Sequence, residues 1–96
     1  MRIKVVGLRN EFEYTSKKTG EKVKAITAYY VREPNSREDD IKGLIAENLF
    51  ITSANYGLIP DGGFSVNAEY DLIYENSGRY AYLIGIIPIE KGSANK

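Results

Sequence analysis

Nine consecutive residues near the N-terminus have the types and spacing to contact a polyanion. Four lysines surround a glycine suited to a hairpin turn in residues 16–24, which read Ser16-Lys17-Lys18-Thr19-Gly20-Glu21-Lys22-Val23-Lys24. Ammonium groups on a projecting hairpin can follow a phosphate backbone, where each neutralised phosphate releases a counterion and adds salt-dependent affinity. A solvent-exposed turn rich in lysine has the same composition, so this segment alone leaves both interpretations open.

Tyrosine is the commonest aromatic residue of the chain, which has eight tyrosines and no tryptophan. A base stacked on an aromatic ring contributes about 1–3 kcal/mol, so outward rings beside the lysines would complete a surface for unpaired nucleotides. Tyr29 and Tyr30 are neighbours in a predicted strand and must point to opposite faces, which leaves open which of them is outward. Tyr14, near the hairpin, and Tyr56, in a predicted loop, are further candidates for stacking.

The charged residues are unevenly distributed along a chain whose formal net charge is zero. Residues 1–32 hold eight cations and three acids, so this segment carries +5 and the remainder carries −5. Such asymmetry predicts one surface that faces a polyanion and a separate acidic surface. Charge pairing between the two segments within the fold is the alternative.

The residue types on which most enzymes depend are missing. The chain has no histidine and no cysteine, which removes the usual general base, the commonest metal ligand and the thiol nucleophile. Asp39-Asp40, which with Glu38 form the only run of adjacent acids, are typical of a solvated loop or a helix cap, and Asp61-Gly62-Gly63 is typical of a turn. We therefore expect a protein that is not an enzyme and that holds neither a metal nor a cofactor.

Runs of β-branched and aromatic residues, bounded by Gly, Asn, Asp and Pro, predict five strands. The strands are expected at residues 3–16 with a bend near Gly7, and at residues 23–32, 44–52, 64–74 and 80–89. The third strand is ambiguous, because residues 41–49 also show helical spacing. Alternation is clearest in the fourth strand, where Tyr70 and Tyr74 take the buried phase.

Five antiparallel strands can form a sandwich or a barrel, and an all-β, OB-like Greek-key barrel with projecting hairpins fits their number and spacing best. A single OB-like domain is expected to cover residues 1–90, followed by a disordered tail at residues 91–96. No apolar run approaches the ~18 residues of a membrane span. Together with the absence of cysteine, this predicts a soluble cytoplasmic protein.

The order of these features resembles the gene V-type single-stranded DNA-binding proteins of filamentous phages. The motifs that carry the resemblance are Phe12-Glu13-Tyr14-Thr15, Lys18-Thr19-Gly20-Glu21, Tyr30-Val31 and Ile87-Pro88. The family has an aromatic residue just after the hairpin glycine, where this chain has Val23. The chain is also similar to small proteins of Gram-positive conjugative elements, in Thr15-Ser16-Lys17-Lys18-Thr19-Gly20 and in Ser36-Arg37-Glu38-Asp39-Asp40-Ile41.

The phage family implies an OB-fold homodimer that coats single-stranded DNA cooperatively and without sequence preference. By this resemblance, Lys18 would contact DNA, Tyr30 would stack on a base, and the hairpin at residues 76–79 would form the dimer arm. The candidate nucleic-acid-binding residues are therefore Lys17, Lys18, Lys22, Lys24, Tyr14, Tyr30, Arg32 and Tyr56. The candidate dimer-interface residues are Tyr74, Arg79, Tyr80 and Tyr82.

The leading hypothesis is thus a non-catalytic, homodimeric coat for single-stranded DNA, in the replication or transfer of a phage or mobile element. Whether it also binds RNA is left open. The alternative is a small β-barrel protein-interaction module of a mobile element that binds no nucleic acid and holds its partner at a sheet edge or at the acidic loop 33–40. A small hydrolytic enzyme is a more distant third hypothesis.

Overall fold

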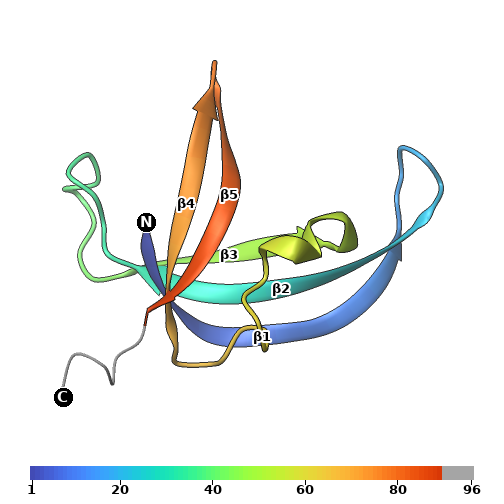
Figure 1. Cartoon of the computed structure of the whole chain (residues 1–96). Helices are drawn as coiled ribbons and strands as arrows, with labels where there is room; N and C mark the ends of the chain where they lie inside the picture. Colours follow the sequence, from blue (N-terminus) through green and yellow to red (C-terminus); the bar gives the residue numbers. More distant parts are fainter. Residues whose placement is uncertain (90–96) are drawn as a thin grey trace.

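The computed structural model describes residues 1–89, so the expected tail at 91–96 lies outside the described part of the chain. Five antiparallel strands form one sheet in the order β3-β2-β1-β4-β5 (Figure 1). The elements are β1 (Arg2–Thr15), β2 (Lys22–Arg32), β3 (Ile45–Thr52), the 3-10 helix η1 (Ser53–Leu58), β4 (Glu69–Ser77) and β5 (Tyr80–Ile89). The all-β fold class is confirmed. The path is a Greek key, because β4 returns after a long connection to lie beside β1.

The curved sheet is open on one side. Within residues 1–89, β3 and β5 form the two edges of the sheet and do not pair with each other. The helix η1 packs against β2, β3 and β5. Two hairpins extend from the body of the molecule, β1–β2 at one end and β4–β5 as a separate arm (Figure 1). The projecting hairpins expected from the sequence are therefore present, while hydrogen bonds do not close the OB-like barrel.

The core lies on the inner face of the curved sheet. Phe64, from the connection between η1 and β4, packs edge-on against Tyr70 with ring centroids 5.1 Å apart. Each large aliphatic side chain buried here contributes roughly 1.5–3 kcal/mol relative to an exposed one. The buried core cluster consists of Ile3, Val5, Ala28, Tyr30, Ile51, Phe64, Tyr70, Leu72 and Ile86.

Two β-bulges interrupt β1. Val5 lies opposite Tyr30 but Gly7 lies opposite Tyr29, so one extra residue is inserted on β1 at this point. A second extra residue lies between Arg9 and Phe12, at residues 10–11. The predicted bend near Gly7 is confirmed as the first of these bulges. Each bulge reverses which β1 side chains face the core, because side chains alternate between the faces of a strand.

Two predicted boundaries can be compared with the structure. Residues 45–52 are a strand, as favoured, and the helical alternative for residues 41–49 does not form. The fourth strand begins at Glu69 and not at residue 64, so that prediction was wrong by five residues. The cause is a turn at residues 66–67, where Asn67 has a φ of 72°. Within residues 1–89, no helix has the length and apolar character to cross a membrane.

Candidate nucleic-acid interface

The outer face of β1–β3 carries a cluster of three aromatic rings. The ring centroids of Phe12, Tyr14 and Phe50 are 5.8–6.2 Å apart, and the exposed ring of Tyr29 lies in the same depression. Phe50 is 48% exposed, although a large apolar side chain is usually buried. We call this depression of about 500 Å³ the aromatic groove, lined by Arg9, Phe12, Tyr14, Thr27, Tyr29, Asn48 and Phe50.

The strand register explains why these residues share a face. Thr27 lies between Arg9 on β1 and Phe50 on β3, and the next outward position on β2 is Tyr29, opposite Asn48. Residues directly opposite one another in antiparallel strands point to the same face. Ala25 and Thr27, the small residues of β2 beneath the rings, are buried by them. The groove is thus assembled from alternate residues of three strands.

Arg9 supplies a cation directly on the aromatic groove. Its guanidinium carbon lies 3.6 Å from the centroid of the Phe12 ring, which is a cation–π contact. The residue as a whole is exposed, so its N–H groups can reach a ligand. A planar guanidinium can donate two parallel hydrogen bonds to a phosphate while its face stays stacked on the ring.

Carboxylates are excluded from the groove face. The three strands that form the groove contain three acids, and all of them lie on the opposite face. Glu47 accepts a hydrogen bond from the buried Tyr30, Glu13 alternates with Phe12 and Tyr14, and Glu11 accepts a hydrogen bond from η1. Lys4 and Arg9 both face outward on β1. A chain of zero net charge therefore has one face on β1–β3 where only cations accompany the rings.

The β1–β2 hairpin carries two of its four lysines in the turn and two on β2. Lys17 and Lys18 lie in the turn just beyond the end of β1, three and four residues after Tyr14. The turn is held by hydrogen bonds from the Gly20 backbone N–H to the Ser16 carbonyl and from the Ser16 N–H to Glu21, both 2.8 Å. All four lysines are exposed, and none forms an ion pair with another residue of the described chain.

Lys22 and Lys24 do not lie on the face of the aromatic groove. Lys24 lies opposite Glu13, and Lys22 lies opposite Thr15, so both take the phase that faces away from Tyr14. Of the four hairpin lysines expected to share the surface of the tyrosines, Lys22 and Lys24 therefore do not, and Lys17 and Lys18 lie in the turn that follows the end of β1 carrying Tyr14.

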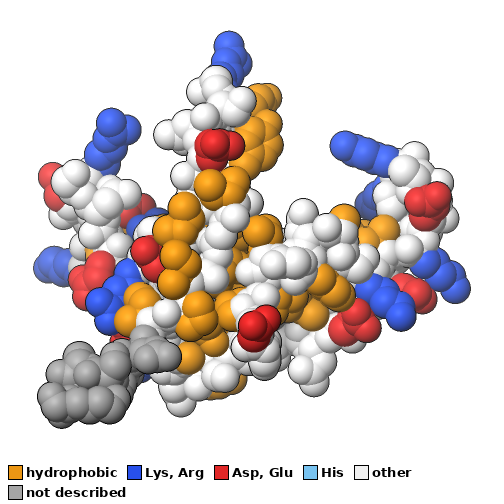
Figure 2. Space-filling view, in the orientation of Figure 1, with side chains coloured by type: hydrophobic (Ala, Val, Ile, Leu, Met, Phe, Trp, Pro, Cys, Tyr) orange, Lys and Arg blue, Asp and Glu red, His pale blue; other side chains and the backbone are white. Residues whose placement is uncertain are grey.

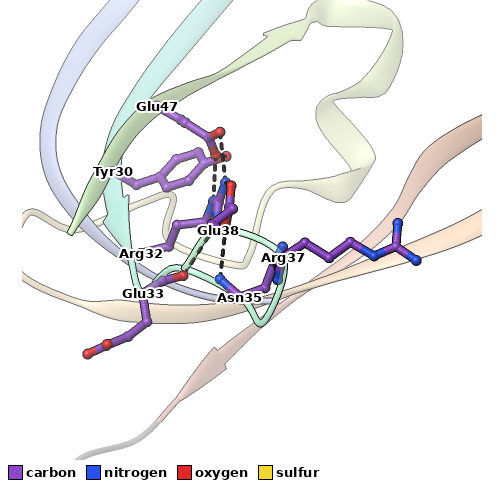
Figure 3. Close-up of polar contacts among 7 residues, drawn as sticks. All are labelled: Tyr30, Arg32, Glu33, Asn35, Arg37, Glu38 and Glu47. Carbon is purple, nitrogen blue, oxygen red and sulfur yellow. Dashed lines mark hydrogen bonds and ion pairs between the residues drawn. The ribbon is translucent and has the colours of Figure 1, made fainter. Parts of the chain in front are cut away.

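Tyr30 and Arg32 face the inner side of the sheet, against the expectation that they contact nucleic acid. Tyr30 is 5% exposed, and its hydroxyl donates a 2.9 Å hydrogen bond to Glu47. Burial and the neighbouring Glu47 carboxylate raise the pKa of Tyr30. Arg32 forms ion pairs of 2.9 Å with both Glu38 and Glu47, and its side chain is only 11% exposed (Figure 3). Neither residue therefore offers a ring face or a free cation.

Arg32 instead clamps the connection between β2 and β3. Its two terminal nitrogens donate to the two carboxylate oxygens of Glu38, at 2.9 and 3.0 Å. Glu38 also accepts a hydrogen bond from the Asn35 backbone, and Asn35 in turn accepts one from the Arg37 backbone. The Arg37 side chain points away from this cluster (Figure 3). The hydrogen bonds from Arg32 lower the pKa of Glu38 to about 2.

Tyr56 is also turned away from the aromatic groove. It belongs to η1, packs against the core cluster and donates a 2.8 Å hydrogen bond to Glu11 on β1. Partial burial, the hydrogen bond and the charge of Glu11 raise the pKa of Tyr56. Its expected role in stacking is not supported by this position, because the ring contacts the core.

The β4–β5 arm carries its own exposed apolar surface. Tyr80 and Tyr82 are 66% and 53% exposed, with ring centroids 6.3 Å apart, and share the outer face with Ile87. Tyr74 takes the inner phase with Leu72, so the candidate interface tyrosines are not all on one face. Figure 2 shows hydrophobic side chains along the arm and a cation at its tip, where Arg79 forms part of the turn.

Charge distinguishes the outer face of the arm from the aromatic groove. The outer positions of β4 include Glu69, which pairs with Arg2, Asp71, which pairs with the N-terminal ammonium, and Glu75, which lies directly opposite Tyr82. Exposed tyrosines therefore occur in two settings, beside cations on β1–β3 and beside carboxylates on β4–β5.

The sequence-based prediction named Tyr14, left Tyr29 and Tyr30 open, and missed the other five residues of the groove, namely Arg9, Phe12, Thr27, Asn48 and Phe50. A strand containing Phe50 was predicted, but its partner strand and face were not. Within residues 1–89, no group of three or more His, Cys, Asp or Glu residues is arranged to hold a metal ion. In comparisons with known proteins, no family model, no curated protein and no solved structure matches this chain.

Proposed function

We propose that this protein binds single-stranded DNA, without sequence preference, through the aromatic groove and the tip of the β1–β2 hairpin. The observation that carries the proposal is the sharing of one sheet face by Tyr14, Tyr29, Phe50 and Arg9, from which every carboxylate of β1–β3 is excluded. Unpaired bases expose flat ring faces and a phosphate backbone, and this face offers aromatic rings and cations.

The position of this face on the fold supports the proposal. In OB folds, oligonucleotides bind across the face of the second and third strands and beside the loop that joins the first two. Here that face contains Tyr29, Asn48 and Phe50, and the equivalent loop contains Lys17 and Lys18. Stacking of each base contributes about 1–3 kcal/mol and tolerates any base, because every base has a π face.

Electrostatics should make only a modest contribution to the affinity. If Arg9, Lys17 and Lys18 each neutralise one phosphate, log K should fall with log salt with a slope of about −2. The proposed site therefore depends on ring stacking more than on charge, which agrees with the zero net charge of the chain.

A second copy of the chain is the proposed partner of the β4–β5 arm. Exposed Tyr80, Tyr82 and Ile87 form an apolar outer face, and Glu75, directly opposite Tyr82, places a carboxylate beside the rings where the aromatic groove has a cation. A two-fold contact between two such arms would cover this surface. We propose that the homodimer coats single-stranded DNA in the cytoplasm during replication or transfer of a phage or mobile element.

Tyrosine fluorescence provides the direct test. Oligo-dT is titrated into the protein at low and at moderate salt, with duplex DNA and oligo-U of equal length in parallel. Saturable quenching by oligo-dT, weaker at the higher salt and absent with the duplex, is the expected result. Absence of quenching by oligo-dT at both salt concentrations would exclude the proposal, and the oligo-U titration shows whether RNA is also bound.

A protein-interaction module remains the second candidate, because the arm exposes apolar side chains beside carboxylates. It predicts that a partner protein is captured through Tyr80 and Tyr82, and that groove substitutions have no effect on this capture. Loss of capture on Tyr29→Ala would argue against it.

A further inference from the structure

The bulge at residues 10–11 determines which side chains of β1 reach the aromatic groove. Arg9 faces outward, so in a regular strand Glu11 and Glu13 would follow it on the groove face. Phe12 and Tyr14 would then point to the opposite face. The extra residue reverses this order, because Phe12 pairs with Ala25 in place of Glu11. One residue therefore decides whether the groove contains two rings or two carboxylates.

The contacts of β1 alone specify this register weakly. Beyond the bulge, residues 12–15 pair with residues 22–25 and with no third strand, except that Ala25 also pairs with Thr52 on β3. On the groove face the Phe12 and Tyr14 rings contact Phe50 of β3, whereas Glu11 and Glu13 on the opposite face are exposed. A two-stranded ribbon held from one side only is prone to slip by one residue, so a contact on the second face adds to the selection of the bulged register.

The Tyr56 hydroxyl makes such a contact. It donates a 2.8 Å hydrogen bond to the Glu11 carboxylate, across a separation of 45 residues. The Tyr56 ring is anchored on the core cluster by η1. Glu11 lies within the bulge itself, and in the regular register its side chain would point to the groove face, away from Tyr56.

We propose that Tyr56 is a positioning residue for the aromatic groove, whose hydrogen bond to Glu11 selects the bulged register that places Phe12 and Tyr14 beside Arg9. This inference rests on the proposed binding function for its effect on affinity. The effect on register can be measured without any ligand.

The first test is Tyr56→Phe, which removes the hydroxyl and keeps the ring on the core. Loss of a net hydrogen bond of ordinary strength shifts the equilibrium between the two registers by about two- to tenfold, and the affinity for oligo-dT falls by up to this factor. The salt slope of binding stays unchanged, because Tyr56→Phe removes no phosphate contact. The matched control Glu11→Gln keeps an acceptor for the hydroxyl and retains at least the affinity of the unsubstituted protein.

Deletion of Asn10 separates the positioning role from a general loss of stability. Removing the extra residue produces a regular strand in which Phe12 still pairs with Ala25, so the groove no longer depends on the bulge. In this background, Tyr56→Phe leaves the affinity for oligo-dT unchanged. An equal loss of affinity in both backgrounds would overturn the proposal.

Nuclear Overhauser contacts between Phe12 and Phe50, whose rings are 6.0 Å apart, report the register of the free protein. These contacts weaken in Tyr56→Phe and persist in Glu11→Gln. Undiminished contacts in Tyr56→Phe would refute the register role even if no nucleic acid binds. Weakened contacts in a protein that binds no oligonucleotide would instead retain the register role and refute only the proposed function.

Discussion

Tyr29 and Tyr30 are adjacent in β2 and have opposite environments: Tyr29 is 43% exposed in the aromatic groove, and Tyr30 is 5% exposed in the core. Because neighbouring residues of a strand point to opposite faces, Tyr29 faces solvent and Tyr30 packs in the core. Tyr30 is fixed further by its hydroxyl, which donates to Glu47. The stacking tyrosine of the proposed function is therefore Tyr29, together with Tyr14.

Substitutions at these two tyrosines should separate binding from stability. Tyr29→Ala is expected to weaken oligo-dT binding by about 1–3 kcal/mol, the usual contribution of one stacked base, with little change in unfolding free energy. Tyr30→Phe is expected to leave binding unchanged and to lower stability by about 1 kcal/mol through the lost hydrogen bond. Fluorescence titration and urea unfolding measure the two effects. The assignment fails if Tyr30→Phe weakens binding more than Tyr29→Ala does.

Arg9 should act through both charge and stacking. Arg9→Ala is expected to reduce the salt slope of binding by about 0.7, the value for one phosphate contact on a single strand. Arg9→Lys keeps the charge but not the planar guanidinium, so the slope should be retained while affinity falls. Titrations at several salt concentrations distinguish the two substitutions. Equal slopes for Arg9→Ala and the unsubstituted protein would show that Arg9 does not contact phosphate.

The two lysine pairs of the hairpin provide a matched comparison. Lys17→Glu with Lys18→Glu reverses charge in the turn of the hairpin and should weaken binding and lower the salt slope by about 1.4, the value for two phosphate contacts on a single strand. Lys22→Glu with Lys24→Glu makes the same change in net charge on the opposite side and should weaken binding much less. A gel shift with oligo-dT compares them. If the two double substitutions behave alike, the hairpin acts through net charge and not through the groove.

The Arg32 clamp should make stability depend on pH in acid. Hydrogen bonds from Arg32 hold the pKa of Glu38 at about 2, below its ordinary value of 4.5. A lowered carboxyl pKa adds stability that is present above about pH 4.5 and is lost as the pH falls towards 2. Urea unfolding between pH 6 and pH 2 should show this loss, and Glu38→Gln should flatten the dependence. A profile that is equally steep in Glu38→Gln would assign the effect to other carboxylates.

Substitutions in the β4–β5 arm should change the oligomeric state without changing the aromatic groove. Tyr80→Ser with Tyr82→Ser removes two exposed rings and is expected to convert a dimer into a monomer. Val66→Ser, at another half-exposed apolar position outside the arm, serves as the control and should leave the dimer intact. Sedimentation velocity measures the change. An unsubstituted protein that is already monomeric at micromolar concentration would refute the proposed dimer.

Local signals in the sequence were enough to predict the fold class and most of the strands. The limits of β2, β3 and β5 follow from β-branched and aromatic runs that end at turn residues, and the two-residue turn before Tyr80 follows from Gly78. The lysine hairpin could also be predicted from local sequence, because its strands and its turn are contiguous in the chain. These features depend on backbone preferences of neighbouring residues, which a single sequence contains.

Only the tertiary structure decided which side chains share a surface. Alternation divides a strand into two faces but does not say which one is buried, so Tyr29 and Tyr30 could not be told apart. The two bulges of β1 then reverse the phase within one strand and bring Arg9 and Phe12 to the same face. Arg32 was assigned to the interface because its partner Glu47 becomes a neighbour only when β3 pairs with β2, and Glu38 only when the connection between these strands folds back. The physical reason is that register, bulges and ion pairs are fixed by contacts between residues distant in sequence, whose energies no local pattern encodes.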